Sequence, residues 1–175
     1  AGQKASMQRP WNGNGPQTSI DTDRGDVIWE PIAPMDRPLD DGWLKPRKMG
    51  GKELEEVREA FVKAAERSIE AGFEVIEIHM AHGYLLHSFL SPLSNFRNDE
   101  YGGSIENRMR FPLEVVKKVR ERIGEKTPLF VRISAEDGID GGWTIEDSIQ
   151  FCHFLKEQGV DVVDCSSGGN SSKGA

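Results

Sequence analysis

The chain has 175 residues, of which 37% are hydrophobic and 29% charged, and its formal net charge is −7. This length and composition allow one globular domain with a core, and no apolar run approaches the ~20 residues that a membrane-spanning helix needs. The negative charge argues against a nucleic-acid partner or an anionic membrane surface, and the two cysteines offer no disulfide framework, so a cytoplasmic location is expected.

Residues 1–50 differ in composition from the rest of the chain. They hold three of the four tryptophans and most of the prolines, and no periodicity persists through them. Residues 12–16 form a turn cluster, and residues 27–29 fit one arm of a small hairpin. We therefore expect residues 1–50 to be a loop- and hairpin-rich segment, and residues 51–175 to hold the regular elements of a single, incomplete domain.

From residue 52 onward, helical and strand periodicities alternate. The expected helices cover residues 52–72, 105–123 and 145–155, and the expected strands cover residues 73–79, 129–134 and 160–166. Gly72 is placed to end the first helix, and Ser104 and Thr144 are suited to cap the second and the third. Between the first strand and Gly103 we expect a long loop.

Alternating helices and short apolar strands predict a parallel sheet, in either a doubly wound open sheet or a (β/α)8 TIM barrel. Side chains alternate along a strand, so His79, Arg132 and Asp164 each point to the face that carries the polar groups near the end of its strand. In a barrel that face is the interior, and active sites lie at its carboxyl-terminal mouth. These strand ends favour an α/β fold that is part of a TIM barrel.

Two histidines lie where the strand over residues 73–79 runs into its loop. His79 and His82 are placed to donate hydrogen bonds to one carbonyl or phenolate oxygen, and Tyr84 offers a phenolic hydroxyl that can deliver a proton. Spacing alone leaves two alternatives: histidines bonded to loop carbonyls, or a metal site. A third metal ligand at matching spacing is missing, because His87 and His153 fall in no zinc pattern, so no metal is expected.

The segments 77–92 and 95–108 carry many fixed positions, reading EIHMAHGYLLHSFLSP and NFRNDEYGGSIENR. They resemble the Old Yellow Enzyme family, in the class of ene-reductases with a His-x-x-His motif. The resemblance extends to residues 131–134, 163–168 and 1–4. It implies that the chain runs from about the end of strand three to the end of strand six of a (β/α)8 barrel, as an internal fragment of a longer enzyme.

The resemblance also implies an activity, that of an FMN-dependent oxidoreductase with NAD(P)H as the reductant. The substrate would be a small α,β-unsaturated carbonyl compound, an enone or enal. His79 and His82 would hold the substrate carbonyl, and Tyr84 would be the catalytic residue that protonates the α-carbon. Alternatives are a flavin-dependent dienoyl reductase, an amine dehydrogenase relative, or a truncated half-barrel without catalytic activity.

Cofactor contacts are implied for three further residues. Arg132 would reach the flavin ring, where a nearby cation stabilises the reduced state, and Ser166 and Gly168 would lie beside the cofactor. From the residues alone, Arg132 has an alternative role in a buried ion pair with Glu77 or Asp164.

Three residues in the first fifty depart from the family pattern. Gln3 stands where the family usually has arginine, and Met35 and Asp36 replace a usual Ser-Ala pair, which puts cofactor contacts in that region in doubt.

The 175 residues alone are expected to be inactive, with unpaired strand edges that favour a homo-oligomer. Residues interpreted as organising loops and helix caps are Tyr101, Gly102, Gly103, Ser104 and Arg108, together with the carboxylates Asp137, Asp140, Glu146 and Asp147, which are placed in a solvated loop and a cap.

Overall fold

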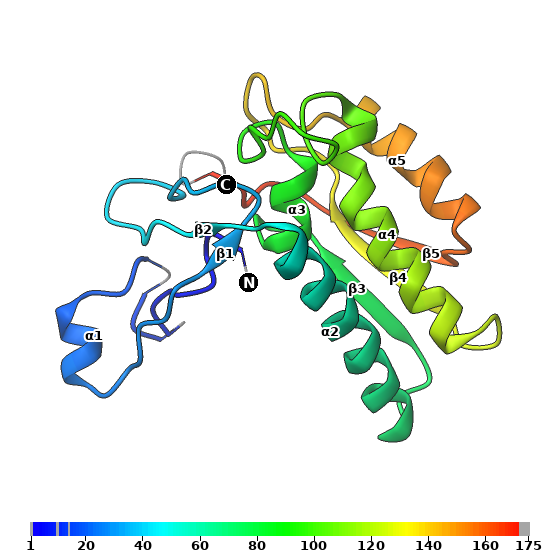
Figure 1. Ribbon diagram of the computed structural model, residues 1–175, viewed down its shortest axis with the longest axis horizontal. Coiled ribbons are helices and arrows are strands. Elements are labelled where there is room, and N and C mark those ends of the chain that lie inside the picture. The colour runs from blue at the N-terminus through cyan, green and yellow to red at the C-terminus, as the bar shows by residue number, and fades with distance from the viewer. Residues whose placement is uncertain (1, 10, 14, 172–175) are drawn as a thin grey trace.

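The computed structural model describes residues 2–9, 11–13 and 15–171, and Figure 1 shows how its elements are arranged. In chain order these are α1 (Ser19–Asp23), β1 (Ile32–Ala33), β2 (Arg47–Lys48), α2 (Gly51–Glu70), β3 (Ile76–Met80), α3 (Leu85–Leu90), α4 (Ile105–Ile123), β4 (Leu129–Ser134), α5 (Ile145–Glu157) and β5 (Val162–Ser166). None of the helices among the described residues is both long and apolar enough to cross a bilayer.

The main sheet contains three strands in the order β3-β4-β5, and both pairings are parallel. In Figure 1, α2, α4 and α5 lie side by side across one face of this sheet, and α4 contacts both of its neighbours. The helices α3 and α4 connect β3 to β4, and α5 connects β4 to β5. Within the described part of the chain, β3 and β5 each keep one edge to which no other strand is bound.

The hydrophobic core lies between the sheet and these helices. Alternate strand residues point into it, and Ile78, Val131 and Ile133 are at most 3% exposed. The helices contribute apolar residues at helical spacing, among them Phe111 and Phe151, which are fully buried. The opposite face of the sheet carries more polar side chains and is partly open, so it is the face available for chemistry.

Most predicted elements are confirmed, with small shifts at their ends. β4 has the predicted bounds, and the Ser104 and Thr144 side chains cap α4 and α5 as expected. β3 begins at Ile76, later than predicted, because the Phe73 N–H donates to the Ser68 carbonyl oxygen at 3.0 Å and so prolongs the end of α2.

Two expectations for the irregular segments are wrong. The long loop expected up to Gly103 contains α3, a helix of 6 residues that are all buried. Six residues make fewer than two turns, so helical periodicity could not show in the sequence. Residues 27–29 belong to no strand of a hairpin, and the strands found in the first fifty residues, β1 and β2, instead pair in parallel.

Hydrogen bonds from main-chain and side-chain groups hold the N-terminal segment against the carboxyl ends of the strands. The Gly2 N–H donates to a carbonyl oxygen of β1 at 2.7 Å. The Arg97 guanidinium, which follows α3, donates to the carbonyl oxygens of Pro34 and Met49 at 3.0 and 2.8 Å. α1 lies apart from the helical layer in Figure 1. These contacts leave Lys4 beside the ends of β3 and β5, where it bears on the site.

Candidate active site

His79, Arg132 and Asp164 occupy one row across the sheet, because His79 is the register partner of Arg132, and Arg132 is that of Asp164. The prediction that these side chains share a face is confirmed. Arg132 Nε lies 3.4 Å from Asp164 Oδ2, and the two side chains are 38% and 42% exposed. Arg132 therefore pairs with Asp164 and not with Glu77, and the pair is partly open to solvent and not buried.

The chain turns sharply after β3, and this turn carries His82 over the ends of the neighbouring strands. His82 has φ of 58° and Gly83 has φ of 71°, so two successive residues are left-handed. The His82 N–H donates to Ser134 Oγ at 2.9 Å, and His82 Nε2 lies 2.7 Å from Ser166 Oγ. One serine from β4 and one from β5 thus hold the main chain and the ring of His82.

The three residues of the predicted catalytic motif form a cluster. The ring centroid of His79 lies 5.2 Å from that of His82 and 5.4 Å from that of Tyr84. Tyr84 is 38% exposed. His79 and Tyr84 line a cavity of about 390 Å³ whose other wall is the apolar side of α2, including Phe61. His79 and Tyr84 therefore present one imidazole and one phenol at the edge of this open cavity, and the His82 ring lies beside that of His79.

Both histidines of this cluster have pKa values below the ordinary value. Burial is the largest cause for His79, followed by the positive charges of His82 and Arg132. Burial also lowers the pKa of His82, with Arg132 again adding to the effect. At neutral pH each ring is therefore neutral and carries one N–H donor, which suits hydrogen bonding to a carbonyl oxygen.

Lys4 connects the two loops at this edge of the sheet. Its Nζ atom donates to the His82 carbonyl oxygen at 3.0 Å and also to the Gly169 carbonyl oxygen. Burial lowers the pKa of the Lys4 ammonium group. The sequence singled out Lys4 only as part of the family resemblance, because nothing near it in the chain indicates a partner so distant.

Ser166 and Gly168, the predicted cofactor residues on β5 and its loop, lie at the same edge. The Ser166 hydroxyl contacts His82. The Gly168 N–H donates to the Glu136 carbonyl oxygen at 2.8 Å, and its own carbonyl oxygen accepts from the Ser134 hydroxyl at 2.8 Å. The Gly168 main chain is therefore already hydrogen-bonded within the protein.

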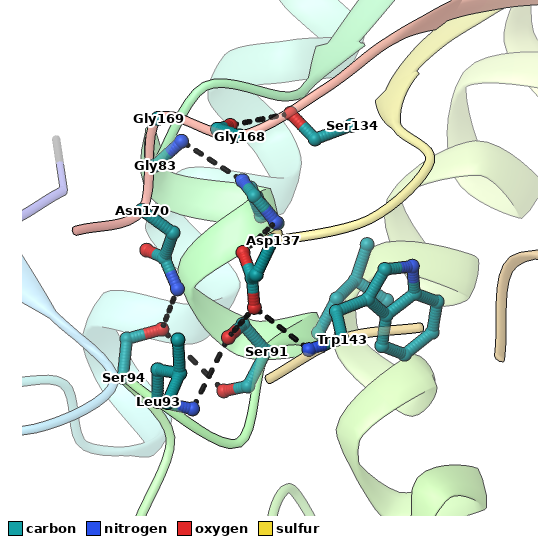
Figure 2. Close-up of polar contacts among 12 residues, drawn as sticks. Gly83, Ser91, Leu93, Ser94, Ser134, Asp137, Trp143, Gly168, Gly169 and Asn170 are labelled. Atoms are coloured by element: carbon teal, nitrogen blue, oxygen red, sulfur yellow. Dashed lines mark hydrogen bonds and ion pairs between the residues drawn. The ribbon is translucent and has the colours of Figure 1, made fainter. Parts of the chain in front are cut away.

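A buried polar network lies behind the cluster, and Figure 2 shows its contacts. Asp137 Oδ2 accepts from the Ser91 hydroxyl at 2.6 Å and from the Trp143 N–H at 2.7 Å. Asp137 Oδ1 lies 3.2 Å from Nε2 of the fully buried His87. Burial raises the pKa of Asp137, but the contacts with His87, Ser91 and Trp143 outweigh it, so the pKa stays below its ordinary value.

Asp137 is a correction to the sequence analysis, which placed it in a solvated loop, because the residue is only 2% exposed. The other carboxylates agree with their interpretation: Asp140 and Glu146 are exposed, and Asp147 closes the capping box at the start of α5. Arg108 organises its loop as expected, since its guanidinium donates to the carbonyl oxygens of Leu90 and Gly103 at 2.8 and 2.6 Å.

Among the described residues, no group of three or more histidine, cysteine or acidic side chains is arranged to hold a metal ion. The two imidazoles and the phenol of the cluster are instead groups suited to hydrogen bonding with the carbonyl oxygen of an organic molecule.

Known proteins are similar to this chain in sequence and in fold. The chain is 52% identical over 145 residues to an NADPH dehydrogenase of Bacillus cytotoxicus, a match that covers 83% of this chain and 41% of the relative. A solved old yellow enzyme homologue from Zymomonas mobilis has a TM-score of 0.70 and 28% identity, over 78% of this chain and 42% of that one. Histamine dehydrogenase from Rhizobium sp. 4-9 has a TM-score of 0.72 and 34% identity, over 80% of this chain and 21% of that one.

The chain spans about two fifths of the length of the Bacillus relative. Its three parallel strands and their helices form part of a (β/α)8 barrel, as predicted. Residues 14–170 match the NADH:flavin oxidoreductase / NADH oxidase family. The recognition made on the His-x-x-His segment is thereby confirmed, and the chain belongs to the NADH:flavin oxidoreductase / NADH oxidase family.

Proposed function

We propose that the protein carrying this chain is an FMN-dependent NAD(P)H oxidoreductase that reduces the activated C=C bond of α,β-unsaturated carbonyl compounds. The observation that carries the proposal is the cluster of His79, His82 and Tyr84 at the carboxyl end of β3, on the face that also holds Arg132. Family membership and the NADPH dehydrogenase relative support an oxidoreductase.

His79 and His82 bind and polarise the substrate in this proposal. Each neutral ring directs one N–H at the carbonyl oxygen, where negative charge develops as the double bond is saturated. Because His82 is already held by Ser134 and Ser166, its ring does not have to reorganise during the reaction. Tyr84, next to His79 and partly exposed, donates its phenolic proton to the α-carbon.

The open face of the sheet fits one end of a flavin. FMN, when bound, supplies the hydride that it has received from NAD(P)H. The partly exposed Arg132 guanidinium lies beside His79. Its Nε atom faces Asp164 Oδ2 at 3.4 Å, so its remaining N–H groups are the donors that would meet an electron-rich ring edge. We propose that Ser166 and Gly168 line the same ring, with Gly168 acting by shape because its N–H is bound to Glu136.

The proposal is tested on the protein expressed from its complete reading frame. We expect stoichiometric bound FMN in the visible spectrum and NADPH or NADH oxidation that depends on cyclohexenone. His79→Ala and His82→Ala should each lower kcat/KM for the enone about 100-fold, the cost of removing one donor to a developing oxyanion. His153→Ala, at an exposed position of α5, is the matched control.

A chimeric protein tests whether this segment itself supports the chemistry. The matching residues of the Bacillus cytotoxicus NADPH dehydrogenase are replaced by those of this chain. A chimera that binds FMN but oxidises an amine such as histamine, without reducing any enone, would replace the proposal with an amine dehydrogenase. A folded chimera without flavin would favour the non-catalytic half-barrel.

A further inference from the structure

A buried histidine lies directly beneath the turn that carries the catalytic cluster. His87, on α3, has no exposed surface, and its Nδ1 atom accepts a hydrogen bond from the Gly83 N–H at 2.8 Å. Gly83 is the residue between His82 and Tyr84. A ring nitrogen that accepts this bond carries no proton, so His87 is neutral and its proton sits on Nε2.

The other side of the ring faces a carboxylate. His87 Nε2 lies 3.2 Å from Asp137 Oδ1. Neither of these buried atoms has a hydrogen-bond partner among the described residues, so each is the polar atom that the other can satisfy. Ser91 and Trp143 occupy the other carboxylate oxygen, Oδ2. An ionised carboxylate is an acceptor only, so Asp137 requires the proton of His87 to be on Nε2 and leaves Nδ1 free to accept.

The turn above His87, which contains His82 and Gly83, is held in place by contacts with other segments of the chain. Two successive left-handed residues are uncommon, and a non-glycine residue such as His82 keeps this conformation only where its surroundings hold it. On one side, the Gly169 carbonyl oxygen would lie 2.2 Å from a Cβ atom on Gly83. The loop after β5, which contains Gly169, therefore packs directly against the turn. On the other side, the His87 ring binds the Gly83 N–H. The turn is fixed from both directions.

We propose that Asp137 and His87 act together as positioning residues for the reaction. Asp137 selects the tautomer of His87 that accepts at Nδ1, and His87 then fixes, through the Gly83 N–H, the directions in which His82 and Tyr84 present their donors to substrate. The kinetic consequence rests on the proposed function, whereas the tautomer and the hydrogen bond are properties of the fold.

Three substitutions separate this role from simple packing. Asp137→Asn keeps the shape of the side chain, but its amide group can donate a hydrogen bond to Nε2 of His87. The ring proton then moves to Nδ1, where it opposes the Gly83 N–H. An Asp-to-Asn change in a catalytic triad selects the wrong histidine tautomer in the same way. His87→Leu removes the acceptor at similar volume, and His87→Asn restores an acceptor oxygen near the position of Nδ1. His153→Asn and Asp140→Asn, at exposed positions, are the matched controls.

The first measurement is nuclear magnetic resonance of the complete protein with 15N-labelled histidine. Labelling histidine carbonyl carbon together with glycine nitrogen selects the Gly83 amide among these 175 residues, because His82–Gly83 is their only His–Gly step. We expect an unprotonated Nδ1 in His87 and a slowly exchanging Gly83 amide. Asp137→Asn should reverse the ring pattern and speed Gly83 exchange at least ~10-fold, the factor for about 1.4 kcal/mol. A proton on Nδ1 of native His87, or unchanged exchange in Asp137→Asn and His87→Leu, would overturn the proposal.

The second measurement is enone turnover per folded, flavin-loaded enzyme. Asp137→Asn and His87→Leu should lower kcat for enone reduction by about 10- to 100-fold, as small misplacements of catalytic groups do, with flavin reduction by NADPH nearly unchanged. His87→Asn should recover most of the loss. Equal turnover in all variants, with only the melting temperature lowered, would show a structural role and refute positioning. A native protein without enone activity would refute the proposed function, while the resonance measurement still decides the tautomer.

Discussion

Gly83 and Gly169 approach each other so closely that neither has room for a side chain. A Cβ atom on Gly83 would lie 2.2 Å from the Gly169 carbonyl oxygen, and one on Gly169 would lie 2.5 Å from the His82 Cα atom. The loops that follow β3 and β5 therefore interlock at the carboxyl ends of the strands. The position of His82 depends on this second loop as much as on its own strand.

Replacing Gly83 with alanine tests the interlock. Gly83→Ala combines left-handed strain of about 1–2 kcal/mol with a main-chain clash of about 1–3 kcal/mol. Gly103→Ala is the matched control, because Gly103 has φ of 83° but nothing within 4 Å of its Cβ position, so only the strain applies. We expect the free energy of unfolding in urea to fall further for Gly83→Ala. Equal losses in the two variants would contradict close packing of the loops.

Tyr84→Phe tests the proton donor in the complete enzyme. The oxidative half-reaction with an enone should slow about 100- to 10,000-fold, the usual contribution of a positioned general acid. Reduction of the flavin by NADPH does not use this proton and should stay nearly unchanged. Tyr101→Phe, whose hydroxyl lies 3.4 Å from Glu114, is the control. Stopped-flow traces in which Tyr84→Phe slows both half-reactions equally would argue against this role.

Glu53 gives a prediction for the acid stability of α2. Hydrogen bonds from Arg47 and from main-chain N–H groups at the start of α2 lower the pKa of Glu53 to about 2. The unfolded state binds the proton more tightly, so this stabilisation is complete above about pH 4.5 and is lost as the pH falls toward 2.

Urea unfolding between pH 6 and 3 provides the measurement. Glu53→Gln should flatten the fall in unfolding free energy with pH, because the group that takes up the proton is gone. Glu56→Gln, with a side chain 62% exposed on the same helix, should leave the slope unchanged. Parallel curves for wild type and Glu53→Gln would show that Glu53 does not contribute.

The isolated 175 residues should retain no stoichiometric FMN and show no enone reduction. The outer edges of β3 and β5 have no strand partner in the described chain, and the face with Arg132 is open. We expect the purified chain to self-associate through these edges, and to lose flavin on gel filtration after incubation with excess FMN. A monomeric, yellow chain that turns over cyclohexenone would contradict this expectation.

The structural elements that local sequence patterns encode were predicted correctly. β4 was predicted over its full length because its residues are strand-forming and apolar on alternate positions. The common face of His79 and Arg132 followed from the same alternation, since both lie near strand ends that parallel pairing brings together. The barrel was favoured over an open sheet for this reason, and the family resemblance agreed with it.

Contacts between distant segments were not predictable in this way. Asp137 lies in a glycine-rich stretch with two other acidic residues, a composition typical of solvated loops. Its partners Ser91 and His87 come from a helix region some fifty residues earlier. Neither α3 nor the Lys4 bridge has a periodic signal. These features depend on how the strand ends are brought together, which no window of sequence contains.

The bridge between the Gln3 side chain and Asn170 joins residues 167 positions apart, and the contact between His82 and Ser166 spans 84. Contacts between residues so far apart in the chain require large loops to close. They therefore add stability only after the intervening strands have paired. We therefore expect the carboxyl ends of the strands and their loops to assemble late in folding, on a sheet and helices that are already in place. Substitutions at Lys4 or Ser166 should then speed unfolding while leaving the folding rate nearly unchanged.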